Sequence, residues 1–439
     1  MDEFDNLLPE DAEYLLNLPF HLAEASKEEG EMVDELSVLL TDYEFIEYKT
    51  FKRLPQELIN DYDLALHSDI QIHQQTKQSL KLIQSAIKLA ANVLSDNPIL
   101  LAGQLWGRLQ SFQKPEIQAM LTQAQQQLQE YIWLRPLKSN LTPPEGALLS
   151  TLTGHKDWVK AVAITPDGKI AVSGSHDCTL KVWDLYSGIE ILTLRGHRAW
   201  IQGVAITSDG KIAVSASIDG TLKVWDLRNG TELRTLIGHT SAVSAVTISL
   251  DGQLAVSASE DKTLKVWDLH SGNEVCTLIG HTGAVNAVVI NPNGQLAVSC
   301  ACDKTLRVWD LHSGTELRTL KGHTDFVNAV AITPDGKLAV SASSDNTLKV
   351  WDINIGTELH TLIGHYYWVW TVAITLDGRF IVSGSWDQTL KVWDLESGEE
   401  ITTFNCEGEL NTCAISPDGV TIVAAGRSNR IHFLRLEGI

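Results

Sequence analysis

The chain has 439 residues, of which 20% are charged, and its formal net charge is −21. It contains no run of about 18 apolar residues, so no membrane span is expected. The acidic start Met1–Asp5 lacks the apolar core of a secretion signal. The acidic balance also argues against nucleic acid as a partner, because phosphates attract Lys and Arg. Thirteen Trp exceed both the 8 Tyr and the 9 Phe, so the positions of the tryptophans become the first question.

Residues 1–134 are predicted to form an all-α domain, because apolar residues recur there at helical spacing. The helical stretches are 11–18, which should end at Pro19, followed by Glu31–Leu40, Pro55–His67, Ile70–Leu94, Pro98–Phe112 and Pro115–Ile132. Trp106 and Trp133 are expected in the core of this domain. Residues 135–146 are rich in Pro and predict a stiff linker.

The acidic excess of the chain belongs mainly to residues 1–69, which carry a balance of −15. This charge is either a solvated helical face or a docking surface for a basic partner.

From residue 148 onward the sequence repeats itself every 42 residues. Gly-His pairs begin at Gly154, Gly196, Gly238, Gly280, Gly322 and Gly364, and Trp-Asp pairs begin at Trp183, Trp225, Trp267, Trp309, Trp351 and Trp393. Each unit contains four short runs of alternating Val, Ile, Leu and Ala, separated by Asp, Gly and Asn. This pattern is typical of a four-stranded antiparallel meander.

The two-part signature resembles that of the WD-repeat β-propeller family, which implies one four-stranded blade for each repeat. Residues Glu407–Leu436 have the strand and turn pattern of a seventh, degenerate unit that stops after its third strand. Ala147–Leu152 has the pattern of the missing fourth strand. We therefore expect an all-β seven-bladed propeller over residues 147–439, closed by strand 147–152 in the last blade.

Each complete repeat holds a His, a Ser, an Asp and a Trp in register. Ser-His-Asp suggests a catalytic triad, but six identical nucleophiles in one ring make no mechanistic sense. The resemblance implies instead a buried network from indole to hydroxyl to imidazole to carboxylate. The predicted tetrads are His155, Ser173, Asp177, Trp183; His197, Ser215, Asp219, Trp225; His239, Ser257, Asp261, Trp267; His281, Ser299, Asp303, Trp309; His323, Ser341, Asp345, Trp351; and His365, Ser383, Asp387, Trp393.

Five further tryptophans lie in the repeats but outside the tetrads. In WD-repeat proteins, partners commonly bind the face from which the loops before the first strand and between the second and third strands emerge. The positions of this chain that match that face predict a partner-binding arc comprising Trp158, Trp200, Phe326, Tyr367, Trp368, Trp370, Trp386, Glu409 and Arg427. Two alternatives stay open: some of the rings could pack under neighbouring loops, and the ligand could be a methylated Lys or Arg, or an apolar peptide.

Three stretches of the helical part carry a second resemblance. Leu18–Ala25, Asn97–Leu109 and Trp133–Leu137 look like the helical domain that precedes WD repeats in signal-transducing NTPases related to the apoptotic protease-activating factor family. The phosphate-binding Gly-x-x-x-x-Gly-Lys-Ser/Thr loop of such NTPases does not occur in this sequence. The chain therefore resembles the sensor half of such a protein.

These features predict a non-enzymatic scaffold that binds a protein or peptide, with a separate NTPase or effector protein as a further partner. The alternative is an autoinhibitory subunit of an NTPase or protease signalling complex. No nucleophile elbow or metal-ligand spacing supports an enzyme, and no metal or other cofactor is expected. The six Cys contain no Cys-x-x-Cys pair and suit free thiols in the cytoplasm.

Overall fold

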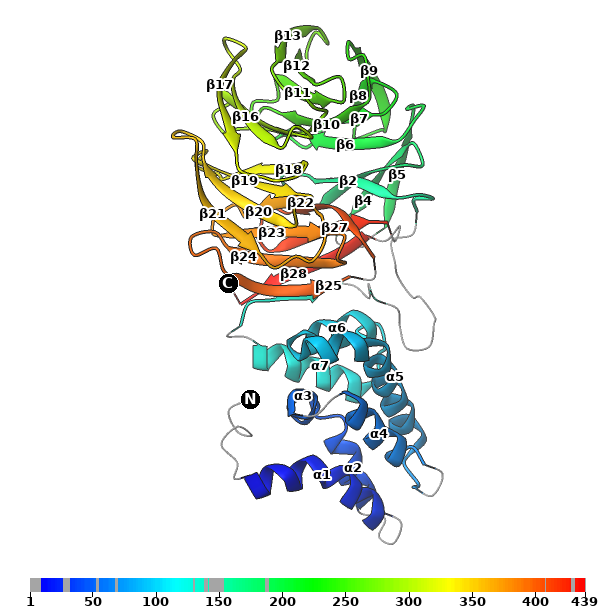
Figure 1. Ribbon diagram of the computed structural model, residues 1–439. Coiled ribbons are helices and arrows are strands. Elements are labelled where there is room, and N and C mark those ends of the chain that lie inside the picture. Colours follow the sequence, from blue (N-terminus) through cyan, green and yellow to red (C-terminus); the bar gives the residue numbers. More distant parts are fainter. Residues whose placement is uncertain are drawn as a thin grey trace. The chain divides into compact units, whose positions relative to one another are not determined.

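The computed structural model describes residues 9–26, 32–52, 55–67, 70–128, 131–137, 141, 154–185, 189–406, 408–427 and 431–438. The chain divides into two compact units (Figure 1). One comprises Met1–Thr151 together with Leu434–Ile439, and the other comprises Leu152–Phe433. In the described part of the chain, every helix is too short or too polar to cross a membrane.

The first unit consists mainly of helices. They are α1 (Pro9–Ala25), α2 (Met32–Leu39), α3 (Tyr43–Lys52), α4 (Pro55–Ala65), α5 (Gln74–Asp96), the 3₁₀-helix η1 (Pro98–Leu100), α6 (Leu101–Leu109) and α7 (Pro115–Gln127). Pro55, Pro98 and Pro115 each stand at the start of a helix, where a missing amide proton costs nothing. The predicted break at Pro19 is wrong, because α1 continues through it and buries Leu22 and Ala23 beyond it.

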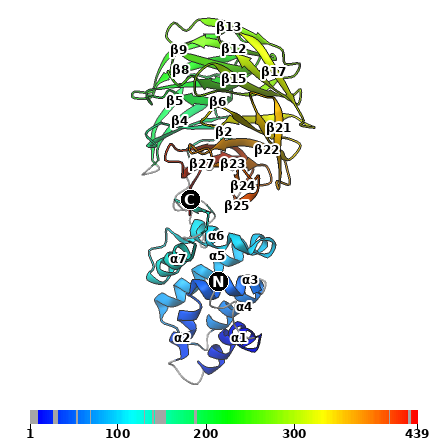
Figure 2. The same cartoon turned by 90° about the vertical axis from the view of Figure 1, so that its left-hand side faces the viewer.

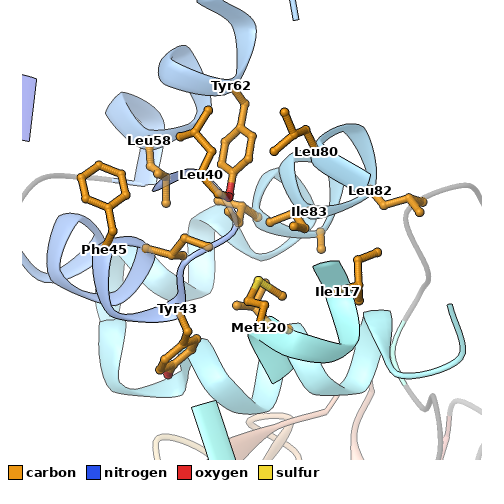
Figure 3. Packing of buried hydrophobic residues seen from close by; sticks show 14 of the residues in the cluster. Leu40, Tyr43, Phe45, Leu58, Tyr62, Leu80, Leu82, Ile83, Ile117 and Met120 are labelled. Carbon is orange, nitrogen blue, oxygen red and sulfur yellow. The ribbon is translucent and has the colours of Figure 1, made fainter. Parts of the chain in front are cut away.

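The core of the helical unit gathers side chains from several helices. Figure 3 shows Leu40, Tyr62, Leu80 and Met120 pointing toward a common centre. Tyr62 is fully buried, and its hydroxyl donates a hydrogen bond of 2.7 Å to the carbonyl oxygen of Leu40. The polar end of this large side chain is therefore satisfied inside the core.

The repeats form blades of four antiparallel strands, and we number the blades in chain order. Blades 1 to 3 consist of β2 (Val159–Ile164), β3 (Ile170–Ser175), β4 (Thr179–Asp184) and β5 (Glu190–Arg195); β6 (Ile201–Ile206), β7 (Ile212–Ser217), β8 (Thr221–Asp226) and β9 (Thr231–Ile237); and β10 (Val243–Ile248), β11 (Leu254–Ser259), β12 (Thr263–Asp268) and β13 (Glu274–Ile279). Blades 4 to 6 consist of β14 (Val285–Ile290), β15 (Leu296–Ala301), β16 (Thr305–Asp310) and β17 (Thr315–Lys321); β18 (Val327–Ile332), β19 (Leu338–Ser343), β20 (Thr347–Asp352) and β21 (Thr357–Ile363); and β22 (Val369–Ile374), β23 (Phe380–Ser385), β24 (Thr389–Asp394) and β25 (Glu400–Asn405).

The first strand of each blade lies beside the first strand of the next blade. Consecutive blades follow one another through the colours from green to red (Figure 2). Apolar side chains of one blade pack against the Trp of the next blade's tetrad, as Val214 and Val224 do around Trp267. The large indoles are therefore the contact surfaces between blades.

A seventh blade completes the ring, and its strand order is β1-β28-β27-β26. It contains β26 (Leu410–Ile415), β27 (Thr421–Gly426), β28 (Ile431–Glu437) and β1 (Trp133–Pro136). This confirms the seven-bladed propeller preceded by helices.

The identity of the closing strand differs from the expectation. We predicted residues 147–152, which lie outside the described residues, whereas β1 is the strand paired with β28. Pro136 is part of β1, although residues 135–146 were expected to form the linker. A Pro is tolerated there because β1 is the outer strand of its sheet, and one edge of such a strand needs no donor.

Candidate functional site

The His, Ser, Asp and Trp of each complete repeat are joined by hydrogen bonds. In blade 3, Trp267 Nε1 donates to Ser257 Oγ at 2.8 Å, and His239 Nε2 lies 2.7 Å from the same oxygen. His239 Nδ1 lies 2.8 Å from Asp261 Oδ2. In the other five blades, the corresponding contacts measure 2.7–2.9 Å.

The protonation states of this network follow from its surroundings. Burial lowers the pKa of His239, and the neighbouring Asp261 opposes that effect. Burial alone would raise the pKa of Asp261, but hydrogen bonds from Thr263, His239 and the amide of Thr240 lower it to about 2. Ser257 has no exposed surface and is held from two sides. The tetrad serines of the other five blades are equally buried, so these hydroxyls have a structural role and a substrate cannot reach them.

The residues of the predicted arc are positioned by backbone hydrogen bonds that recur from blade to blade. The amide of His176, in the β3–β4 turn, donates to the carbonyl of Trp158 at 2.9 Å. The same bond joins Trp386 to Trp368 at 3.0 Å and Arg427 to Glu409 at 2.9 Å. In each blade, the loop before the first strand is thus tied to the turn between the second and third strands, and their side chains emerge together.

Rings from blades 1 and 2 stack in series. His176 lies against Trp200 with ring centroids 4.1 Å apart and planes 8° apart. The centroids of His176 and Trp158 lie 5.4 Å apart at 31°. His176 thus lies in contact with both indoles.

Arg427 of blade 7 continues this series toward blade 6. Its guanidinium carbon lies 3.9 Å from the ring centroid of Trp158 and 4.6 Å from that of Trp386. The guanidinium also forms an ion pair with Glu409. A planar cation that contacts two indoles and a carboxylate is held firmly.

Trp386 is the centre of the blade 6 cluster. Its ring centroid lies 5.1 Å from Trp368, 5.0 Å from Trp370 and 6.3 Å from Tyr367. Its Nε1 donates a hydrogen bond of 3.0 Å to Asn411 Oδ1.

The series of contacting side chains spans four blades, and we call it the aromatic ladder. It comprises Trp200, His176, Trp158, Arg427, Trp386, Trp368, Trp370 and Tyr367.

Of the nine residues predicted for the arc, the structure brings eight into contact, counting Glu409 through Arg427. Phe326, which precedes β18 in blade 5, makes no ring contact with the ladder within the described part of the chain. Trp200, Tyr367 and Phe326 are the open members, with 47%, 46% and 48% of their surface exposed. The remaining rings are partly buried against one another.

Three participants stand at loop-face positions of the repeat but were not among the nine residues predicted for the arc, namely His176, Lys160 and Asn411. Lys160 Nζ lies 4.5 Å from the ring centroid of Trp370 and 3.5 Å from Asn411 Oδ1. Burial, together with the nearby charge of Arg427, lowers the pKa of Lys160 to about 8. His176 stands directly before the tetrad Asp, which is the repeat position that also supplies Trp386 and Arg427, so its place in the repeat was the available signal.

The described residues contain no group of three or more His, Cys, Asp or Glu side chains arranged to hold a metal ion. Cys300 and Cys302 lie two positions apart in the sequence. Cys300 is buried, and the Sγ of Cys302 lies 3.5 Å from the side-chain nitrogen of Asn286.

Two family models match the chain. The WD domain, G-beta repeat, matches residues 146–184, 188–226, 230–268, 272–310, 314–352 and 356–394. The APAF-1 helical domain matches residues 3–129.

Curated proteins are similar to this chain over shorter stretches. The mouse NACHT domain- and WD repeat-containing protein 1 is 29% identical over 178 residues, which cover 39% of this chain and 11% of that protein. The nuclear distribution protein PAC1 of Debaryomyces hansenii is 48% identical over 52 residues, covering 12% and 10%. The small ribosomal subunit protein RACK1 of Caenorhabditis elegans is 48% identical over 46 residues, covering 10% and 14%. The matches thus span only about a tenth of the length of these relatives.

Proposed function

This chain belongs to the WD-repeat family, and on that premise we propose that it is a non-enzymatic interaction scaffold. Its aromatic ladder binds a protein or a peptide. The observation that carries the proposal is the contact series itself, which joins the loop ends of four blades and leaves Trp200 and Tyr367 about half exposed. Trp, Tyr and Arg are the residues that dominate the binding energy of protein interfaces.

The ladder suits this role because its members hold one another in place. Side chains that are already ordered by stacking lose little conformational entropy when a ligand binds. Trp200 and Tyr367 can then contribute apolar area to the interface, while the partly buried rings between them form a rigid support.

The helical unit, which matches the APAF-1 helical domain, provides a second contact surface. The NACHT relative carries a NACHT domain by its name, and the present sequence has no phosphate-binding loop. We therefore propose that the chain works with a separate NTPase or effector protein. Its six cysteines are free thiols, which supports a place in the reducing cytoplasm.

The test is selection of displayed heptapeptides on the full chain, followed by fluorescence anisotropy of the enriched peptides. The double variant Trp200→Ala, Tyr367→Ala should raise Kd at least about tenfold, as expected when two hot-spot side chains are truncated. The control is Leu250→Ala, Leu376→Ala, which truncates side chains that are 67% and 63% exposed in the turns after β10 and β22.

Melting temperatures of both variants should remain near that of the unchanged chain, because the truncated side chains are exposed. If peptides bind the ladder variant and the control variant equally well, the aromatic ladder is not the binding surface.

A further inference from the structure

Beside the aromatic ladder lies a positive charge, that of Lys160, which no described carboxylate balances. Arg427 is paired with Glu409, whereas Lys160 forms no ion pair with any residue that the structure describes. The contacts of its ammonium group are the Trp370 ring and the amide oxygen of Asn411. A partly buried ammonium group is more stable beside an anion than beside a ring and an amide alone.

Asn411 differs from its counterparts in two other blades. At the same place in the first strand, Asn286 and Asn328 donate their Nδ2 to the carbonyl oxygens of Val327 and Val369, at 2.8 and 2.9 Å. Asn411 instead uses its Oδ1 to accept hydrogen bonds from Trp386 and Lys160.

As a result, Asn411 Nδ2 makes no hydrogen bond within the described chain, although only 6% of the residue is exposed. The Nε1 of Trp370 is buried and likewise makes no hydrogen bond there. Two donors and one unpaired cation thus belong to one small cluster, in which Trp370 and Asn411 both contact Lys160. Buried donors of this kind are costly unless an acceptor reaches them.

We infer that this cluster receives a carboxylate, supplied by an Asp or Glu side chain of the bound peptide, with Lys160 as its counter-ion. The inference rests on the proposed function and names the chemistry that the aromatic ladder selects. One unbalanced positive charge matches one carboxylate and falls short of a doubly charged phosphate.

A cationic ligand fits this cluster less well than a carboxylate does. The faces of Trp158 and Trp386 already carry Arg427, and that of Trp370 carries Lys160. A methylated Lys would therefore meet a like charge at each of these rings.

The experiment uses four pools of heptapeptides, randomised except at the central position, which is fixed as Glu, Gln, trimethyl-lysine or phosphoserine. Binding of each pool to the full chain is measured by fluorescence anisotropy. We expect the Glu pool to bind about tenfold tighter than the Gln pool, which is the scale of one charged hydrogen bond. The trimethyl-lysine and phosphoserine pools should bind more weakly than the Glu pool.

Two variants assign the preference to this cluster. Lys160→Met removes the charge while keeping an apolar stem against Trp370, and Asn411→Asp supplies Lys160 with a carboxylate from the chain itself. Both should reduce the ratio of Glu to Gln binding to about one. Lys169→Met, in the exposed turn between β2 and β3, should leave the tenfold ratio unchanged.

The outcomes separate the two proposals. If all pools bind alike, or if trimethyl-lysine or phosphoserine binds best, while Trp200→Ala, Tyr367→Ala still raises Kd at least about tenfold, the carboxylate inference is overturned and the proposed function stands. If no pool distinguishes the unchanged chain from that double variant, both are overturned. A Glu preference that survives in Lys160→Met and Asn411→Asp would overturn the assignment to Lys160.

Discussion

His176 and Trp200 stack face to face, with ring centroids 4.1 Å apart, although they belong to different blades. Neighbouring blades of the propeller share no backbone ladder, because each sheet contains only its own four strands. Side chains must therefore hold the loop ends of neighbouring blades together. At this edge of the ring, a stacked pair fulfils that task with apolar area and no charge.

The surroundings of His176 predict the direction in which its pKa is shifted. Burial lowers the pKa of His176 below its ordinary 6.5, and the positive charge of Lys160 lowers it further, whereas Asp157 opposes both. The imidazole should therefore be neutral at pH 7. A proton NMR titration of the ring should give a midpoint below 6.5. Lys160→Met should move that midpoint upward, and Lys169→Met should not; an unchanged midpoint in Lys160→Met would show that Lys160 exerts no field at the ring.

Arg427 should resist replacement by lysine. Its guanidinium contacts the faces of Trp158 and Trp386 at once, and an ammonium group cannot reproduce two planar stacks. Arg427→Lys should lower the free energy of unfolding by about 1–2 kcal/mol. The control is Arg379→Lys, because Arg379 is exposed and, among the described residues, its guanidinium lies over a single ring, that of Phe380. Urea denaturation measures the free energy of unfolding of both variants. If both lose the same amount, the contact of Arg427 with two indoles adds no stability.

Two serines of one strand should differ in importance. Ser257→Ala removes the oxygen that serves both Trp267 and His239, and leaving those buried groups unpaired costs about 1–3 kcal/mol. Ser259→Ala should cost less, because its acceptor, the carbonyl of Ala242, also receives the amide of Glu260, and the amide of Asp261, which donates to Ser259 Oγ, belongs to a residue that is only partly buried. Blade 4 already has Ala301 at that position. Thermal unfolding of both variants measures the two losses of stability. A larger loss in Ser259→Ala than in Ser257→Ala would contradict the prediction.

The closing strand predicts a difference between two glycines. Gly438 and Gly419 both have positive φ angles, of 81° and 73°, so a change to Ala carries a similar backbone cost of about 1 kcal/mol at each. At Gly438 a Cβ atom would also overlap the backbone of Tyr131, next to β1, whereas at Gly419 it would meet nothing within 4 Å. Gly438→Ala should therefore lower the melting temperature further.

Hydrogen exchange localises that effect. Amides of β1 and β28 should exchange faster in Gly438→Ala than in Gly419→Ala, because the added contact separates the two strands. Equal protection in both variants would contradict the role of Gly438 in this pairing.

The repeat and its blades were predictable because one motif recurs at a constant interval, with turn residues at fixed offsets. The helices and the closing strand were harder to predict from the sequence. Helix α3 was missed because its buried residues include Lys49 and Thr50 as well as Phe45 and Ile46, so polar residues do not mark its exposed side. Strand β1 was missed because Pro136 reads as a linker residue, and its partner β28 lies at the other end of the sequence.

The sequence predicted which positions of the repeat belong to the candidate site, but it did not predict which of their side chains contact one another. Repeat offsets placed Trp158, Trp386 and Arg427 at loop ends of one face. The insertion of Arg427 between the two indoles depends on side-chain conformations and on the closure that brings blade 7 beside blade 1. Asn411 Nδ2 is left without a partner because Asn411 Oδ1 accepts from Trp386 and Lys160, and a rule that reads each position by itself does not describe such a contact.

Pairing of β1 with β28 also sets the order of events during synthesis. Arg135 and Glu437 form an ion pair across 302 positions, so one partner leaves the ribosome long before the other exists. Every blade from 1 to 6 can fold while the chain is still growing, since its four strands are consecutive. The last blade cannot, because its outer strand, β1, must wait until β28 has been synthesised. Until then the nascent propeller is an open arc with unpaired strands at its seam, which is the stage at which a chaperone would be needed most.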